Sequence, residues 1–193
     1  MIKIIDGKQE GLFLSRRDYY QGKSLLAKIT MPITKRLRAY YAGKYIGAKE
    51  SHLDIGCGDG YFMKRSKCRH IYGLDLKYGD FFRDKLDFPD NYFDYVTMLA
   101  VIEHLDFPLS IIRECHRILK DDGILVITTP KAKGLWIIRL YAPHFEEIQS
   151  RHKQYFDYQK MHRMLKGCFS VCVYRTFEFG FNQLFVCKKV NLE

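Results

Sequence analysis

The sequence has 193 residues, of which 47% are hydrophobic and 15% aromatic, and this is enough apolar side chain for one domain with a buried core. No stretch approaches the roughly 20 consecutive apolar residues that a membrane-spanning helix needs, and the opening residues MIKIIDGKQE lack the long apolar centre of a secretory signal. We therefore expect a cytoplasmic protein of one domain, without a membrane span.

The net charge of +10 is spread unevenly along the chain. Residues 1–50 carry 11 Lys and Arg against 4 Asp and Glu, whereas residues 51–130 carry 10 against 13. Residues 131–170 carry 8 against 3, and residues 171–193 carry 3 against 2. An acidic middle region therefore lies between basic flanks, and a charge distributed in this way says more about partners than about fold.

The first predicted elements lie before and after Ser51. Residues 12–47 mix aromatic, aliphatic and basic side chains, and Pro32 interrupts them, so we predict two helices that meet near this proline and form a cap. From Ser51 the apolar run SHLDIG leads into the loop GCGDG and then into YFMKRSK, which has a helical pattern. This order predicts a strand, a glycine turn and a helix.

Strands and helices then alternate up to Pro130. HIYGLDL (70–76) and YFDYVTMLA (92–100) have the aromatic and β-branched content of buried strands. PLSIIRECHRILK (108–120) places its apolar residues on one face of a helix, and ILVITTP (124–130) predicts another buried strand. Such alternation indicates βαβ units and a largely parallel sheet.

The pattern changes after Pro130. Residues 157–167 have a helical pattern, and FSVCVYRTFEF (169–179) and GFNQLFVCKK (180–189) predict two strands joined at Gly180. We expect this strand pair to close one edge of the sheet in antiparallel fashion.

The loop after the first strand of the core has the composition of a ligand site. Gly56, Gly58 and Gly60 let the backbone approach a ligand closely, and a following helix N-terminus favours polar groups there. Asp75 ends the next strand, 19 residues after Gly56, where a carboxylate accepts hydrogen bonds from both hydroxyls of a ribose. The two features together predict a nucleoside site.

The spacing of the glycines argues against a dinucleotide. The dinucleotide fingerprint G-x-G-x-x-G needs a third glycine where this chain has Tyr61. Asp54, just before the loop, would repel a pyrophosphate but would attract a cation. S-adenosylmethionine carries a sulfonium and an ammonium, so we predict it as the cofactor.

At this point the chain resembles a known family, the class I S-adenosylmethionine-dependent methyltransferases, and within it the group related to ubiquinone-pathway and small-molecule methyltransferases. The resemblance covers residues 51–130 in order, together with the closing strand. Its matching segments are LDIGCGDGYF (53–62), YGLDL (72–76), LDFPDNYFDYV (86–96), VIEHL (101–105), ECHRILKDDGILVITTP (114–130) and GFNQLFVCKK (180–189).

The resemblance implies an α/β fold. This is a Rossmann-like three-layer sandwich with a mostly parallel seven-stranded sheet, an antiparallel last strand and an N-terminal helical cap. Within a single domain 1–193 it implies a cap over residues 1–50, a cofactor-binding core over 51–130, a substrate-side lid over 131–168 and closing strands over 169–193.

The resemblance also implies roles for residues. Asp54 would lie near the methionine amino group, the glycines and Cys57 would border the methionine and ribose, and Asp75 would hold the ribose. Leu76 and Leu86 would flank the adenine, Leu99 and Ala100 would lie beside the methionine, and either Asp80 or Asp84 would contact the adenine amino group. Relatives usually have a longer helix and a further strand after the ribose-binding acid, where this chain has only 77–85, so the adenine side is expected to be more open.

Methyl transfer from a sulfonium is an in-line displacement, so a general base is needed only for a hydroxyl or a protonated amine. The candidates are Glu103 and His104, which follow the strand 92–100, and His144 and His152 in the basic segment after Pro130. Glu103 and His104 could instead stabilise their loop, and His144 and His152 could instead cap helices. Some relatives bind a divalent metal through Glu-x-x-Glu-His, but Ala100 replaces the first Glu here, and the six cysteines form no C-x-x-C pair, so we predict no metal.

The basic flanks correspond to the regions that cover the substrate pocket in similar enzymes. We therefore expect a small anionic acceptor, with O-methylation favoured, although solvated lysines and arginines explain the same charge. RNA is the alternative, because Lys35, Arg36, Arg38 and Lys44 are interleaved with Tyr40, Tyr41 and Tyr45. A second alternative is a domain that binds the cofactor without catalysis. The oligomeric state is left open.

Overall fold

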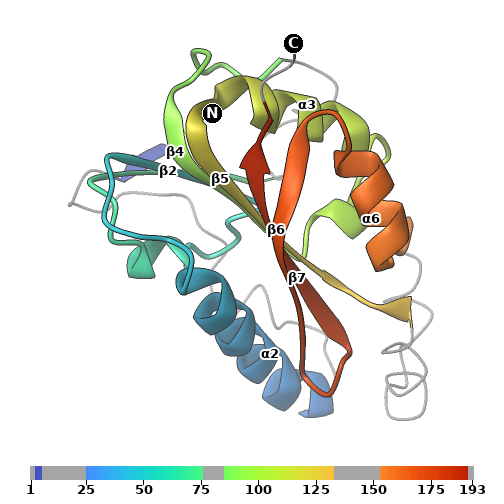
Figure 1. The fold of residues 1–193 in the computed structure, drawn as a ribbon. Coiled ribbons are helices and arrows are strands. Elements are labelled where there is room, and N and C mark those ends of the chain that lie inside the picture. Colours follow the sequence, from blue (N-terminus) through green and yellow to red (C-terminus); the bar gives the residue numbers. More distant parts are fainter. Residues whose placement is uncertain (1–2, 6–24, 76–84, 133–152, 191–193) are drawn as a thin grey trace.

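The computed structural model describes residues 3–5, 25–75, 85–132 and 153–190. Its centre is a seven-stranded sheet in the order β1-β3-β2-β4-β5-β7-β6 (Figure 1). The strands are β1 (Lys3–Ile5), β2 (Ser51–Ile55), β3 (His70–Leu74), β4 (Phe93–Leu99), β5 (Leu119–Pro130), β6 (Phe169–Phe177) and β7 (Asn182–Lys189).

The strand directions confirm the predicted sheet. Neighbouring strands β3, β2, β4 and β5 are parallel, which places their carboxyl ends at one edge. The last strand, β7, is antiparallel to both β5 and β6, and the two closing strands meet at a turn in which Gly180 has φ +84°. The sheet also contains β1, a strand that the sequence pattern did not predict. It pairs antiparallel with the outer edge of β3.

The helices form a layer on each face of the sheet, as the sandwich prediction requires (Figure 1). On one face, α3 (Pro108–Ile118) and α6 (Tyr158–Leu165) pack with alternate residues of the strands, among them Leu53 and Ile127, in one hydrophobic cluster. On the other face, α2 (Leu25–Gly43) packs in a second cluster that includes Val126 and Leu184. The alternation of strand side chains separates the two clusters.

The prediction of two helices meeting near Pro32 is wrong, because α2 continues through this residue. Proline in a helix interior costs roughly 3 kcal/mol through its missing amide hydrogen and its ring. Downstream, Ala39 and Ala42 are buried against the sheet, and the burial of this face offsets that cost.

The helix predicted from YFMKRSK is reduced to one turn. After the glycine loop the chain forms only a short 3-10 helix, η1 (Met63–Arg65), which ends at Ser66 before β3. The apolar residues of this segment are nevertheless buried: Phe62 packs edge-on against His52, and Met63 is almost fully covered. The helix N-terminus that we expected to favour polar groups at this loop is therefore absent, and no helix dipole contributes there. None of the described helices is long and apolar enough to cross a membrane.

Candidate functional site

The carboxyl ends of the parallel strands bring the predicted cofactor residues together. The glycine loop follows β2, Asp75 follows β3, Ala100 follows β4 and Lys131 follows β5. Since these strands are neighbours in the sheet, residues that are up to 75 positions apart in sequence lie along one edge.

The glycine loop is tied to the end of β3 by its own backbone. The amides of Gly56 and Cys57 both donate to the carbonyl oxygen of Leu74, at 2.7 and 3.0 Å. Gly56, Gly58 and Gly60 all have positive φ (77°, 54° and 68°), the left-handed region that glycine adopts without strain. A Cβ at Gly56 would collide with Val101, whereas a Cβ at Gly58 would have no described atom within 4 Å.

Asp75 also contacts the glycine loop. Its Oδ2 accepts a hydrogen bond from the amide of Gly58 at 2.8 Å, so that the carboxylate predicted to hold a ribose also fixes the middle of the glycine loop. The open space at Gly58 and the carboxylate beside it fit the nucleoside predicted from the sequence.

Asp54 is buried at the end of β2, with 3% of its surface exposed. Its Oδ1 accepts a hydrogen bond from the hydroxyl of Thr97 on β4, at 2.6 Å. Burial is the main cause that raises the pKa of Asp54 to about 7; the Thr97 hydrogen bond opposes this rise, and the charge of Asp75 adds to it. A cation beside Asp54 would relieve this cost, which fits the ammonium expected there.

Cys57 lies in the loop with its sulfur directed towards β3. A Cβ at Gly73 would lie 2.8 Å from the Cys57 sulfur, so a glycine is needed at this position of β3 for the two elements to pack. Burial, together with the charges of Asp54 and Asp75, raises the pKa of the Cys57 thiol above its ordinary value. The thiol is therefore a packing group and not a nucleophile.

Leu99 and Ala100 end β4 close to the glycine loop. Leu99 is partly buried against the cluster beneath α2. Ala100 has φ +60°, uncommon for a residue with a side chain, and its amide donates to the carbonyl oxygen of Thr128 at 2.8 Å. This turn directs Val101 against Gly56, which joins the β4 end to the loop.

Glu103 is 1% exposed and lies in the 3-10 helix η3 (Ile102–His104). Its Oε2 accepts a hydrogen bond from the hydroxyl of Thr129 at 3.0 Å, and its backbone oxygen accepts from the amides of Lys153 and Gln154. Burial raises the pKa of this carboxyl, while the charge of His104 opposes the rise. These contacts of Glu103 are those expected if it stabilises its loop. The neighbouring His104 is only partly buried.

The structure also shows an ion pair that the sequence did not indicate. Lys35 of α2 pairs with Asp59 in the glycine loop, and its ammonium lies 4.9 Å from the centre of the Tyr61 ring. Helix α2 is thus bound directly to the glycine loop. No spacing rule could have found this contact, because the two residues are 24 positions apart on different elements.

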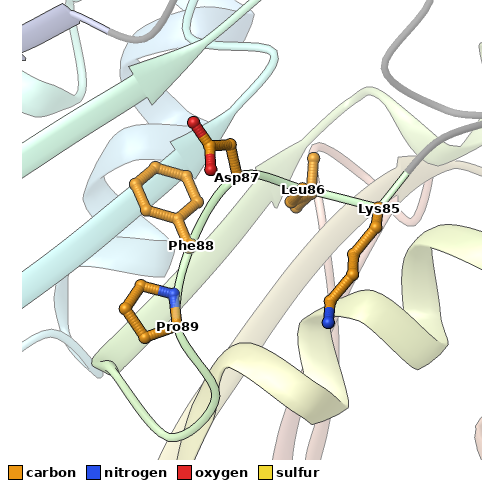
Figure 2. Close-up of a pocket in the computed structure, with 5 residues that line it drawn as sticks. All are labelled: Lys85, Leu86, Asp87, Phe88 and Pro89. Atoms are coloured by element: carbon orange, nitrogen blue, oxygen red, sulfur yellow. The ribbon is translucent and has the colours of Figure 1, made fainter.

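An open pocket of about 440 Å³ borders the segment that leads into β4. Figure 2 shows the five residues that line it, Lys85 to Pro89, along this segment. Leu86, predicted to flank the adenine, is 4% exposed and belongs to the core, while its amide donates to Glu114 at 2.8 Å.

Arg117 of α3 fixes this segment. It donates to the backbone oxygens of Leu86 and Phe88, at 2.9 and 2.8 Å, and forms ion pairs with Asp90 and Glu114. Arg117 holds the pKa of Asp90 and of Glu114 below the usual range.

Several predicted residues lie outside the described residues, namely Leu76, Asp80, Asp84, His144 and His152. Within the described ranges, no group of three or more His, Cys, Asp or Glu side chains is placed to hold a metal ion.

Comparison with known proteins decides the family. A family model described as a methyltransferase domain matches residues 28–168, about three quarters of the chain. The chain belongs to the methyltransferase domain family. This confirms the class I S-adenosylmethionine-dependent methyltransferase predicted from the motifs, and with it S-adenosylmethionine as the cofactor.

Two curated methyltransferases illustrate the sequence similarity. A demethylmenaquinone methyltransferase of Staphylococcus epidermidis is 28% identical over 152 residues, which cover 71% of this chain and 56% of that protein. A ubiquinone biosynthesis O-methyltransferase of Glaesserella parasuis is 30% identical over 145 residues, covering 60% of this chain and 61% of that protein. The chain thus spans little more than half the length of these relatives.

Solved structures confirm the methyltransferase fold. A putative methyltransferase of Haloferax volcanii, in complex with the Trm112 methyltransferase activator, aligns with a TM-score of 0.68 at 17% identity, covering 93% of this chain and 99% of that chain. A SAM-dependent methyltransferase of Archaeoglobus fulgidus aligns with a TM-score of 0.60 at 19% identity, covering 82% and 94%. At these identities the similarity concerns the fold.

Proposed function

We propose that this methyltransferase transfers the methyl group of S-adenosylmethionine to a small anionic acceptor, most readily to an oxygen atom. The observation that carries the cofactor site is the hydrogen bond between the Gly58 amide and Asp75, which makes the glycine loop and the ribose-binding carboxylate one structural unit. The proposed cofactor residues are Asp54, Gly56, Cys57, Gly58, Gly60, Asp75, Leu99 and Ala100, with Leu76, Asp84 and Leu86 on the adenine side.

When bound, the cofactor would supply an activated methyl group, whose carbon an acceptor oxygen attacks in line while the sulfur leaves as a neutral thioether. The task of this chain is then to hold the cofactor at the sheet edge and to bring the acceptor to it. Asp54 is proposed to receive the ammonium and Asp75 the ribose, while Glu103, His104 and His144 remain the proposed proton acceptors for a hydroxyl substrate. The burial of Glu103 favours His104 among the described candidates.

One observation supports an anionic acceptor, and a second supports a small one. Residues 1–50 and 131–170, which lie on either side of the loop and Asp75 in the sequence, carry an excess of basic side chains. One curated relative is named as an O-methyltransferase of ubiquinone biosynthesis, and another as a demethylmenaquinone methyltransferase, and both names refer to small molecules.

The tyrosines on and just after α2 support an RNA acceptor less well than a small molecule. Tyr41 packs against Phe177 with 4.9 Å between ring centres, and Tyr45 packs against the cluster beneath α2, so neither ring is presented for stacking on a base. Tyr40 is exposed, but Lys44 lies 4.2 Å from the centre of its ring.

Titration calorimetry with S-adenosylhomocysteine tests the cofactor site. We expect the wild-type protein to bind it and Asp75→Ala to weaken binding by about 100-fold, because the change removes a charge-assisted ribose contact together with the anchor of Gly58. Asp75→Asn, which keeps an oxygen for the Gly58 amide, should lose less. A wild-type protein without affinity, or an Asp75→Ala variant with unchanged affinity, would contradict the proposal.

A methyl-transfer assay tests the acceptor. Phenolic carboxylic acids and the corresponding neutral phenols, offered side by side with labelled S-adenosylmethionine, should show transfer to the acids first. Tight cofactor binding without transfer to any acceptor would favour the domain that binds the cofactor without catalysis.

A further inference from the structure

A line of hydrogen bonds runs beneath Asp54, on the face of the sheet that α2 covers. Thr97 donates to Asp54 Oδ1 at 2.6 Å, His52 Nε2 lies 3.0 Å from the Thr97 hydroxyl oxygen, and His52 Nδ1 lies 2.9 Å from the hydroxyl oxygen of Ser66. The line therefore connects the end of η1 to the end of β2. Neither the family motifs nor the proposed function uses His52 or Thr97.

His52 and Thr97 are both completely buried. Burial lowers the pKa of His52 to about 3, so the imidazole is neutral at physiological pH and carries one hydrogen. Because the Thr97 hydroxyl has a single hydrogen and gives it to Asp54, its oxygen must accept from His52 Nε2. His52 Nδ1 then accepts from Ser66, and every donor in the line points towards Asp54.

The surroundings of Asp54 make this direction important. Among the described residues, the titratable group that acts on it is Asp75 at the end of β3, whose charge opposes ionisation of Asp54; Asp54 in turn raises the pKa of the Cys57 thiol in the loop. Among the interactions that the described part of the chain makes with Asp54, only the Thr97 hydrogen bond lowers its pKa and so favours the ionised form. The Thr97 hydroxyl hydrogen is directed to Asp54 as long as the Thr97 oxygen accepts a hydrogen bond from His52 on its other side.

We propose that His52 is a positioning residue, which acts through Thr97 to hold the Asp54 carboxylate as the acceptor for the ammonium of the cofactor. This inference rests on the proposed function, since it takes the methionine end of the cofactor to lie beside Asp54. The adenosine end, held by Asp75 on the next strand, does not depend on His52.

The experiment compares two ligands that differ only at the methionine end. S-adenosylhomocysteine carries the ammonium, whereas methylthioadenosine has the same nucleoside and thioether without it. We expect His52→Leu to weaken binding of S-adenosylhomocysteine by about 10-fold, because the Thr97 hydroxyl loses the donor that orients its hydrogen bond to the Asp54 carboxylate, and to change the affinity for methylthioadenosine by less than about twofold. Thr97→Val, which keeps the shape of the side chain, should show the same selective loss.

His52→Gln is the matched control. The Gln amide nitrogen donates to Thr97 as His52 Nε2 does, so this variant should recover most of the affinity for S-adenosylhomocysteine. A purely structural role would not give this pattern, because a damaged core weakens both ligands alike. If His52→Leu fails to fold, Thr97→Val alone decides between the two.

The pH dependence provides a second measurement. Between about pH 5.5 and pH 7.5, where the ligand ammonium stays protonated, the wild-type affinity for S-adenosylhomocysteine should rise as Asp54 ionises, while the affinity for methylthioadenosine stays flat. In His52→Leu the rise should move to higher pH. Equal losses for both ligands, or no loss in either His52→Leu or Thr97→Val, would overturn the positioning role. A wild-type protein that binds neither ligand would instead overturn the proposed cofactor site.

Discussion

His52 should also set how the protein responds to acid. Its pKa is about 3 in the folded protein and about 6.5 in an unfolded chain. Above pH 6.5 the imidazole is neutral in both states, and its contribution to stability is fully present. As the pH falls below 6.5, His52 binds a proton in the unfolded chain but not in the folded protein. Stability is therefore lost progressively down to about pH 3.

We therefore expect His52→Gln, which cannot protonate, to lose less stability than the wild type between about pH 7 and pH 4.5. Asp54 contributes in the opposite direction, because its pKa is raised to about 7 and its contribution is lost as the pH rises through that value. The comparison of wild type with His52→Gln separates the two groups. Urea unfolding at both pH values measures the difference, and identical slopes against pH would contradict the prediction.

The glycines of the cofactor loop should differ in their tolerance of a side chain. Gly58→Ala adds a methyl group in open space, so only the positive φ opposes it, and we expect a loss of about 1 kcal/mol. Gly56→Ala adds the same strain and a collision with Val101, and should cost at least about 3 kcal/mol. Thermal unfolding of the two variants measures both losses, and equal melting temperatures would show that the loop moves away from Val101.

At the scale of residues, the sequence predicted the groups at the strand ends and missed those behind them. Gly56, Gly58 and Asp75 follow strands with clear patterns, and the parallel sheet brings such positions together. Thr97 and His52 lie inside strands, where a polar residue is recognisable only by the neighbour it meets. That neighbour depends on the register of β2 against β4, which no local pattern specifies.

Among the elements, the segment before β4 is held by two side chains of α3, Arg117 and Glu114. Arg117 donates to two backbone oxygens and to Asp90 of this segment, and to Glu114 on its own helix, and its side chain is 17% exposed. We expect Arg117→Ala to destabilise the protein by about 2 to 3 kcal/mol, because the carbonyl oxygens of Leu86 and Phe88 lose their donor.

Arg113 on the same helix provides the control, since it is exposed. Arg113→Ala should change stability by no more than about 0.5 kcal/mol, although helix propensity and net charge change in the same way. Urea unfolding compares the two variants. If both lose the same stability, Arg117 acts through the charge of the helix and not through its contacts with the segment 86–90.

The elements that the sequence predicted well have a strong apolar period. The helix predicted at 108–120 appears as α3, although it ends at Ile118 and β5 begins at Leu119, five residues before the predicted strand; the predicted strand pair appears as β6 and β7. The errors lie where tertiary contacts override local preference: Pro32 is accommodated within α2, and YFMKRSK forms one 3-10 turn. The three residues of β1 are too few to show a period, and their pairing with β3 is set by the sheet edge alone.

At the scale of the whole molecule, the motifs predicted the layers and the family, but they predicted little about how α2 packs on the sheet. The Lys35–Asp59 ion pair and the burial of Ala42 join α2 to the rest of the domain. These contacts depend on how α2 lies across the sheet, and sequence spacing carries no information about that orientation.

The net charge of +10 gives the last prediction. The basic flanks are proposed to attract an anionic acceptor over several ångströms of water. Raising the salt concentration from about 50 to about 300 mM should then lower kcat/KM for a phenolic acid substrate several-fold, because the screening length shortens. The affinity for S-adenosylhomocysteine should change by less than about twofold, since its proposed contacts with Asp54 and Asp75 are short and at least partly buried. Steady-state kinetics and calorimetry at the two salt concentrations measure both effects. A kcat/KM that does not respond to salt would mean that the acceptor is recognised without its charge, and that the lysines and arginines of the flanks serve only to keep the surface solvated.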